Sequence, residues 1–554
     1  MGEPRKPRAL GGQGVNRREL IKAGVTGGLA VAAGSAVPTA LRGETEPSAP
    51  QIPRFELEEA TAAQLQAEMN AGRRTAHGLV EAYLDRIRAL DGSLKSVIEV
   101  NPDAAAAAAA LDAERGSKGP RGPLHGIPVL IKDNIATADR MATTAGSLAL
   151  VGAVAPRDSS VATRLRAAGA VIIGKTNLSE WANFRSSKSS SGWSGRGGQC
   201  RNPYALDRTP CGSSSGTGAA VAANLAVVGV GTETDGSIVC PSGANSLVGI
   251  KPTVGLVSRS GIVPISHTQD TAGPMARTVA DAAALLSAIA GVDPADAATA
   301  ESRGKAASDY TQFLDPHGLN GARIGVARAK FFGYSPETDE LIEDALREMK
   351  RAGAVLVDPA DIPHAGEFDD AEFEVLLYEF KADLNAYLAE WAPGAAVRTL
   401  SDVIAFNEKN RDRELQYFRQ DVMEKAEKKG PLTEAAYRKA LKRCRELSRT
   451  KGLDAVMTRL RLDAIVAPTG APPWTIDLVD GDHFLGASST PAAVAGYPSV
   501  TVPAGYVFGL PVGVTFIGKA WSEGTLIRLA YSFEQSTKRR RAPRLLPTAD
   551  LSSK

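Results

Sequence analysis

A repeated junction constrains the fold more than any other feature of this sequence: a helical segment ends at a glycine and leads directly into an apolar run. One junction is at Gly169, which precedes the apolar residues 170–173, and another is at Gly353, which precedes residues 354–357. Glycine readily adopts the left-handed conformation that ends many helices, and a short apolar run is typical of a buried strand. The pattern therefore predicts an α/β fold.

Other segments extend this prediction to one large sheet flanked by helices. A helical face is expected over residues 56–90, with an interruption near Gly72. A further helix is expected from Asn101, because Asn at a cap and Pro102 at the first helical position precede a run of alanines. Four more apolar runs can supply strands: residues 127–131, 324–327, 464–467 and 512–517.

Composition and charge exclude several classes of protein. With 43% hydrophobic and 23% charged residues over 554 positions, the chain is not a disordered protein, a collagen or a coiled coil. The 64 basic residues nearly balance the 62 acidic ones, so no overall basic field points to a nucleic-acid partner. After the N-terminal region, no apolar run approaches the ~20 residues of a membrane span. We therefore expect a folded protein that acts on a compact substrate.

The cysteines give little information at this stage. Four cysteines are too few for a disulfide scaffold, and none is spaced as a CxxC pair that would suggest zinc: Cys200, Cys211, Cys240 and Cys444. Cys240 is expected to be a small packed residue rather than a reactive thiol. No metal site is predicted.

The N-terminal region has the layout of a signal peptide. Its first 22 residues carry six basic and two acidic side chains, and a weakly apolar stretch continues to Ala40. The segment Asn16-Arg17-Arg18-Glu19-Leu20-Ile21-Lys22 resembles the twin-arginine signal, which exports folded proteins. We therefore predict a signal peptide over residues 1–40, a linker over 41–54 and a periplasmic or extracellular destination. A basic disordered tail is the alternative.

The remainder is expected to form one domain over residues 55–545, followed by a tail over 546–554. Residues 367–461 are charged and helical with interspersed aromatics, which suits either a helical cap over a site or a solvated outer layer. The basic run from Lys538 to Arg541 is expected to be solvated.

Two motif matches are predicted to be coincidental. Residues 169–176 match the phosphate-loop pattern GxxxxGK[ST], but the four variable positions are apolar strand residues that cannot cradle a phosphate. Residues 212–216 match GxSxG, and His267 or His483 could complete a Ser–His–Asp triad. However, a nucleophile elbow needs a buried strand directly before it, whereas residues 202–212 read as a loop. A triad hydrolase remains a remote alternative.

A third constellation is more specific. The Gly/Ser-rich stretch 212–218 is followed by an Ala/Val helix and strand and then by Gly231-Thr232-Glu233-Thr234-Asp235-Gly236-Ser237. Upstream, the segment Ile127-Pro128-Val129-Leu130-Ile131-Lys132-Asp133-Asn134 places a lysine at the end of a strand. Here the sequence resembles the amidase signature family, and the resemblance covers about residues 55–545. It implies a single large α/β domain whose mixed, twisted central sheet is flanked by helices.

The resemblance implies a Ser–Ser–Lys triad with Ser237 as nucleophile, Ser213 as bridging serine and Lys132 as base. It also implies a non-proline cis bond at Gly212–Ser213. No cofactor or metal is required. Backbone N–H groups that stabilise the oxyanion are expected from Thr234, Asp235, Gly236 and Ser237, and supporting contacts from Asn134, Ser214 and Asp235. A free lysine has a pKa of about 10.4, so the base needs surroundings that lower this value by roughly three units.

The substrate is inferred from finer similarity. Residues 191–199, 202–204, 210–212 and 231–241 resemble the peptide amidase branch of the family, which implies conversion of a peptide C-terminal amide to a carboxylate and ammonia. The expected partner is therefore a small-molecule or short peptide amide. Aryl or fatty acyl amides, a glutaminase like that of glutamyl-tRNA amidotransferase, and an inactive binding protein are the alternatives. The acyl pocket is expected in the helical segment 367–461.

Overall fold

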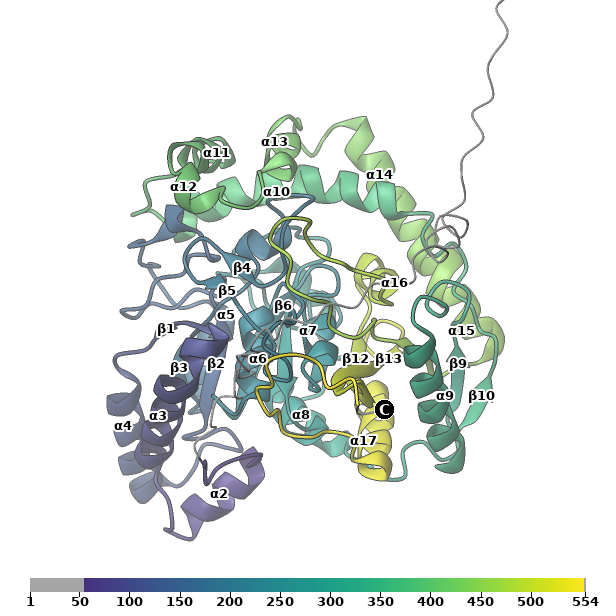
Figure 1. The fold of residues 1–554 in the computed structure, drawn as a ribbon, viewed down its shortest axis with the longest axis horizontal. Helices are drawn as coiled ribbons and strands as arrows, with labels where there is room; N and C mark the ends of the chain where they lie inside the picture. The colour runs from purple at the N-terminus through teal and green to yellow at the C-terminus, as the bar shows by residue number, and fades with distance from the viewer. Residues whose placement is uncertain (1–53, 553–554) are drawn as a thin grey trace, which may run out of the picture. The chain divides into compact units, whose positions relative to one another are not determined.

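The computed structural model describes residues 54–552, so the predicted signal peptide lies outside the described residues. The domain is built on an eleven-stranded sheet with strand order β1-β3-β2-β6-β8-β7-β12-β13-β11-β9-β10 (Figure 1). Parallel and antiparallel neighbours both occur, which confirms a mixed sheet. The strands are β1 (Val97–Val100), β2 (Pro128–Lys132), β3 (Val171–Thr176), β6 (Val228–Glu233), β7 (Val248–Lys251), β8 (Thr271–Ala276), β9 (Arg323–Val326), β10 (Val355–Val357), β11 (Ala464–Pro468), β12 (Ser499–Val507) and β13 (Leu510–Ile517), with a separate pair β4 (Trp193–Ser194) and β5 (Gly198–Gln199).

Helices flank the sheet, as predicted for an α/β domain (Figure 1). The α-helices are α2 (Ala62–Asn70), α3 (Ala76–Leu94), α4 (Ala104–Lys118), α5 (Ser160–Ala167), α6 (Ser215–Ala222), α7 (Val239–Ala244), α8 (Val279–Ile289), α9 (Pro336–Arg351), α10 (Asp369–Trp391), α11 (Leu400–Lys409), α12 (Arg411–Glu414), α13 (Asp421–Glu427), α14 (Ala435–Arg445), α15 (Asp454–Leu460), α16 (Thr490–Ala495) and α17 (Glu523–Thr537). Short 3₁₀ segments are η1 (Leu148–Leu150), η2 (Glu180–Asn183), η3 (Ala297–Ser302) and η4 (Tyr310–Phe313), and η5 (Glu446–Leu453) is a π-helical segment. Among the described residues, no helix has the length and hydropathy needed to cross a membrane.

The sheet joins two halves of the chain. Strands β1, β3, β2, β6, β8 and β7 come from residues 97–276, and the other five come from residues 323–517. The halves meet where β7 pairs antiparallel with β12. One apolar cluster runs through both halves, with fully buried members such as Val129 and Phe516, and it includes side chains of helices α3, α8 and α17. The main core therefore spans the junction.

The helix-to-strand junctions are largely confirmed. Gly169 has φ +77° and links α5 to the fully buried strand β3, and Gly72 has φ +69° between α2 and α3. Gly353, with φ +94°, likewise links α9 to β10. The expectation of a buried strand was wrong at this second junction, because β10 is the last strand of the sheet and Val355 is 46% exposed. An edge strand lacks a neighbour on one side, which sequence periodicity does not reveal.

Residues 367–461 are helical, as predicted. Helices α10 to α14 lie together along one side of the domain, beyond β4 and β5 (Figure 1). Helix α10 is the inner member of this group, since many of its side chains, including Phe380 and Leu384, are fully buried. The segment is therefore a packed layer and not merely a solvated one.

The prediction that the C-terminal basic run is solvated holds for Lys538 and Arg541, which are exposed, but it was wrong for Arg540. The Arg540 side chain is only 11% exposed, and its guanidinium donates to Glu59 Oε2 at 2.7 Å and Oε1 at 2.8 Å. The same group donates to the Ser246 and Ala222 carbonyls at 2.7 and 3.1 Å. Part of the predicted tail also packs on the domain, because the Leu206 amide donates to the Leu546 carbonyl. Arg540 therefore has a structural role that its position in a basic run did not indicate.

We expect Arg540→Ala to destabilise the domain by about 2 kcal/mol, since hydrogen bonds to charged groups contribute about 1.5–3 kcal/mol. Thermal unfolding measures the change. The matched control is Arg539→Ala: Arg539 is 33% exposed and lies 3.7 Å from Glu348, so its loss should change stability by less than about 0.5 kcal/mol. Equal melting temperatures for the two variants would contradict the assignment.

Candidate active site

Lys132 is the last residue of β2, and its side chain is fully buried. Strand β2 lies between β3 and β6 and runs parallel to both. Every residue of β2 is buried, as expected for a central strand covered on both faces. The apolar sequence before Lys132 therefore carries an amino group into the interior of the domain.

Among the described residues, the Lys132 amino group has hydroxyl and carbonyl partners only. Its Nζ donates to Ser213 Oγ at 2.8 Å, to Thr232 Oγ1 at 2.9 Å and to the Thr232 carbonyl at 3.3 Å. Burial lowers the pKa of Lys132 to about 7, although the nearby carboxylates of Asp270 and Glu233 oppose this shift. A substantial fraction of Lys132 is thus neutral at physiological pH and can accept a proton.

Ser213 lies in the tight turn that precedes α6. The Gly212–Ser213 peptide bond is cis, as the family resemblance implied, and the Ser213 side chain is fully buried. The start of α6 is packed closely against neighbouring backbone: a Cβ on Gly216 would lie 2.2 Å from the Ser96 carbonyl oxygen and 2.5 Å from that of Asn177. Glycine at this position therefore lets the first turn of α6 approach the backbone next to β1 and β3.

Ser237 lies in the turn that joins β6 to α7. Gly236 has φ +76°, a conformation that favours glycine. The backbone N–H groups of Asp235, Gly236 and Ser237 donate to no protein acceptor within residues 54–552. The next two amides, those of Ile238 and Val239, donate to Glu233 Oε2 at 2.7 and 3.0 Å. The turn thus presents unpaired donors beside Ser237, as an oxyanion site requires.

The structure brings the three predicted residues into one region but joins only two of them directly. Lys132 and Ser213 are hydrogen-bonded, whereas no hydrogen bond joins the hydroxyls of Ser213 and Ser237 within the described structure. The two serine turns are adjacent, because the Ser214 amide donates to the Ser237 carbonyl at 3.2 Å.

The supporting residues Asn134 and Ser214 converge on Thr232, a residue that the sequence analysis did not select. Asn134 Nδ2 donates to Thr232 Oγ1 at 2.9 Å, and Ser214 Oγ donates to the Thr232 carbonyl at 3.0 Å. Thr232 Oγ1 therefore accepts from both Lys132 and Asn134. The one sequence feature that could have identified Thr232 is its position near the end of β6, one residue before Glu233.

Two further polar residues, also missed, hold the turn that carries Ser237. Thr234 Oγ1 donates to Asp270 Oδ1 at 2.6 Å, and burial raises the pKa of Asp270 to about 6. Thr490, at the start of α16, donates from Oγ1 to Asp235 Oδ2 at 2.7 Å. Both partners are distant in sequence from the turn, so no local pattern could have revealed them.

A cavity of about 390 Å³ opens onto this turn. Its polar side includes Ser237 and Asp235, and its apolar side combines residues from several elements: Ala182, Phe184, Ile265, Leu376, Trp474 and Phe484. Leu376 belongs to α10, so the helical segment contributes one residue to the wall of this cavity. The cavity can hold a small amide with an apolar substituent.

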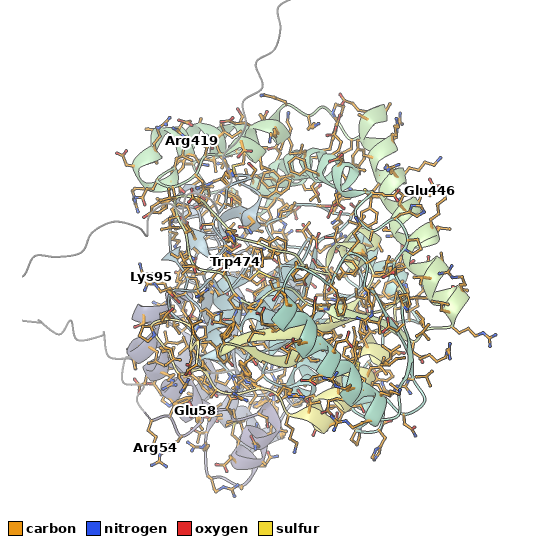
Figure 2. The ribbon with its side chains drawn as sticks, turned by 45° about the vertical axis from the view of Figure 1, so that its right-hand side comes forward. Arg54, Glu58, Lys95, Arg419, Glu446 and Trp474 are labelled. Carbon is orange, nitrogen blue, oxygen red and sulfur yellow. A yellow bond between two sulfur atoms is a disulfide. The ribbon has the colours of Figure 1, made fainter. Side chains whose placement is uncertain are left out.

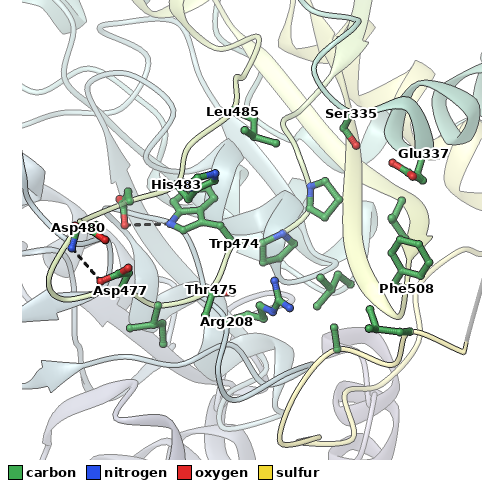
Figure 3. Close-up of a pocket in the computed structure, with 18 of the residues that line it drawn as sticks. Arg208, Ser335, Glu337, Trp474, Thr475, Asp477, Asp480, His483, Leu485 and Phe508 are labelled. Atoms are coloured by element: carbon green, nitrogen blue, oxygen red, sulfur yellow. Dashed lines mark hydrogen bonds between the residues drawn. The ribbon is translucent and has the colours of Figure 1, made fainter. Parts of the chain in front are cut away.

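A second cavity, of about 630 Å³, shares Trp474 and Asp482 with the first (Figure 3). Trp474 Nε1 donates to Asp482 Oδ1 at 3.1 Å, and Asp482 also accepts from the Ser191 amide at 3.0 Å. In Figure 2, Trp474 lies near the middle of the view, and Arg419 and Glu446 mark the helical segment above it. The loop around Trp474 thus borders both cavities.

The two histidines considered for a triad have other surroundings. His267 Nδ1 lies 2.8 Å from Asp383 Oδ2, and His483 lines the second cavity (Figure 3). Neither histidine is among the described residues that line the cavity at Ser237. The phosphate-loop match is also excluded, because Val171–Thr176 form β3.

Cys240 was expected to be a small packed residue rather than a reactive thiol, and the expectation did not include its disulfide partner. Cys211 and Cys240 form a disulfide with a Cα–Cα distance of 6.0 Å. Their separation of 29 residues carries no recognisable signature, because only the folded turns bring them together. Cys200 and Cys444 are free and buried.

Comparisons with known proteins agree with this geometry. The family model described as Amidase matches residues 78–527. The crystal structure of native peptide amidase from Stenotrophomonas maltophilia superposes with a TM-score of 0.85 at 54% identity, covering 88% of this chain and 99% of that one. A protein named as a probable amidase of Arabidopsis thaliana is 44% identical over 89% of this chain and 93% of its own. A glutamyl-tRNA(Gln) amidotransferase chain of Myxococcus xanthus is 34% identical over 88% of this chain and 100% of its own.

We expect the Lys132 amino group to titrate near pH 7, because its burial disfavours the charged form. NMR of protein labelled with ¹⁵N-lysine measures this pKa. In Asp270→Asn the value should fall further, since the Asp270 carboxylate favours the protonated lysine. A Lys132 pKa near 10 would contradict the burial of a neutral amine.

Proposed function

This chain belongs to the amidase family and is an amide-hydrolysing enzyme, and on that premise we propose that it hydrolyses peptide C-terminal amides through a Ser–Ser–Lys triad. One observation carries the proposed triad: the buried Lys132 amino group, with its pKa lowered to about 7, lies 2.8 Å from Ser213 Oγ. A general base of this kind is most effective near neutral pH.

In the proposed mechanism, neutral Lys132 accepts the proton of Ser213, which in turn accepts the proton of Ser237. Ser237 Oγ attacks the amide carbonyl, and the unpaired amides of its turn stabilise the oxyanion. The proton returns to the nitrogen of the leaving group, the C–N bond breaks, and ammonia departs from an acyl-enzyme. Water then attacks the ester with the same base assistance and releases the carboxylate. Hydrogen bonds at catalytic sites often form fully only when substrate is bound. Proton transfer from Ser237 to Ser213 is therefore compatible with the lack of a hydrogen bond between their hydroxyls in the described structure.

The choice of peptide amides has two supports. The 54% identity to a peptide amidase structure exceeds the 34% identity to the amidotransferase chain, whose name ties it to glutamyl-tRNA. The second cavity, which shares Trp474 and Asp482 with the first, offers room for a chain that continues beyond the residue bound at Ser237. Aryl and fatty acyl amides are the competing substrates.

We also propose export by the twin-arginine route. The motif at Arg17 and Arg18 motivates this proposal, and it lies outside the described residues. The Cys211–Cys240 disulfide supports it independently, because such bonds persist mainly in oxidising compartments.

We expect rapid ammonia release from a dipeptide amide, and slower release from an aryl amide, a fatty amide and free glutamine. Ser237→Ala should lower kcat/KM by at least roughly 1000-fold, because it removes the nucleophile. The matched control is Ser242→Ala in α7, whose buried hydroxyl has no hydrogen-bond partner within the described part of the chain; it should retain activity. Preference for another amide would change the substrate class, and an active Ser237→Ala would refute the nucleophile.

The rate should also depend on pH through the base. Protonated Lys132 cannot accept a proton, so kcat/KM should fall about tenfold for each pH unit below about 7 and level off above it. Lys132→Ala should lose on the order of 1000-fold in kcat. A profile that is flat between pH 5 and pH 8 would exclude Lys132 as the base, whereas Ser242→Ala should reproduce the parent profile.

A further inference from the structure

We infer that the Cys211–Cys240 disulfide positions the triad by holding the bridging-serine turn against the nucleophile turn. The inference rests on the roles proposed above for Ser213 and Ser237. Cys211 lies two residues before Ser213, and Cys240 lies three residues after Ser237. The covalent bond therefore closes a loop whose two ends are the two serine turns.

Hydrogen bonds also link these turns. The Ser214 amide donates to the Ser237 carbonyl at 3.2 Å. The Asn245 side-chain amide, which is fully buried, donates to the Pro210 carbonyl at 2.9 Å and to the Pro241 carbonyl at 2.7 Å. Asn245 thus joins the residues that flank the two cysteines, and it is a polar counterpart of the disulfide. If the disulfide is opened, these weaker contacts must keep the turns in register.

The position of the disulfide suits a direct effect on the reaction. Both cysteines line the cavity of about 390 Å³ at Ser237. Cys240 is partly exposed, whereas Cys211 is buried, so this cavity is the route by which a small reductant would approach the bond. All four cysteines of the chain lie in the described part, and this disulfide is the only one among them, since Cys200 and Cys444 are free and buried.

The reaction is sensitive to the distance between the two turns. Proton transfer from Ser237 to Ser213 requires the two hydroxyls to approach within hydrogen-bonding distance, and a misplacement of about 1 Å can cost on the order of 100-fold in rate. The cavity walls contributed by Phe184, Leu376 and Trp474 come from other segments of the chain. Opening the disulfide should therefore lower kcat more than it raises KM.

The first experiment reduces the folded enzyme with dithiothreitol. Two electrons and two protons convert the disulfide to two thiols, and dithiothreitol becomes its cyclic disulfide. We expect kcat for a dipeptide amide to fall at least fivefold, with KM changed less than twofold and the near-UV circular dichroism retained. Labelling of Ser237 by a fluorophosphonate should slow by a similar factor, and reoxidation should restore both rates. Reduced, folded enzyme with kcat within twofold of the parent value would overturn the inference.

Variants distinguish an effect of the disulfide on the position of the two serine turns from an effect on the stability of the domain. Cys211→Ser/Cys240→Ser should show the lowered kcat and no response to dithiothreitol, whereas Cys444→Ala should keep both the parent kcat and its sensitivity. Asn245→Ala should enlarge the effect of reduction, because it removes the second link. If the double variant does not fold, the kcat of the reduced parent enzyme still tests the inference. Activity that survives in Ser237→Ala would refute the proposed nucleophile instead, so the two failures are distinguishable.

Discussion

The hydrogen bond between the Lys132 amino group and the Ser213 hydroxyl lies in the interior of the domain, and several elements keep water away from this amino group. A lysine whose pKa falls from 10.5 to about 7 has its charged form disfavoured by about 5 kcal/mol relative to water. Two parallel neighbours of β2, an apolar strand sequence and a turn rich in small residues together exclude solvent from this position. The same exclusion that disfavours the ammonium makes the neutral amine available as a base.

Strand direction explains why a lysine at residue 132 meets a turn at residues 234–237. Strands β2 and β6 are adjacent and parallel, so their carboxyl ends reach the same edge of the sheet. Lys132 ends one strand, and Glu233 ends the other. Thr232 then links the two ends through a single hydroxyl that accepts from Lys132 and Asn134. Lys132 and Thr232, which are 100 residues apart in sequence, are thereby joined by a hydrogen bond.

Much of this arrangement could be predicted from sequence because it depends on local patterns. The apolar runs became β2, β9, β11 and β13, and the lysine after the first run became the buried amine. The features that escaped prediction depend on long-range contacts: the exposure of β10, the pairing of Cys211 with Cys240 and the burial of Arg540. Thr490 and Asp270 were missed for the same reason, since their partners in the nucleophile turn lie far away in sequence. Periodicity describes one segment at a time and does not identify its partner.

The ion pair between Glu59 and Arg540 joins residues 481 positions apart, near the two ends of the described chain. The strand β12, which connects the two halves of the sheet, is synthesised more than 200 residues after its neighbour β7. On a ribosome, the β7–β12 pairing cannot form until residues 499–507 have emerged, and the ion pair cannot form until Arg540 has emerged. The domain therefore cannot complete its folding before these residues have emerged, and a shorter nascent chain would leave the β7 edge of its sheet unpaired and open to association with other chains.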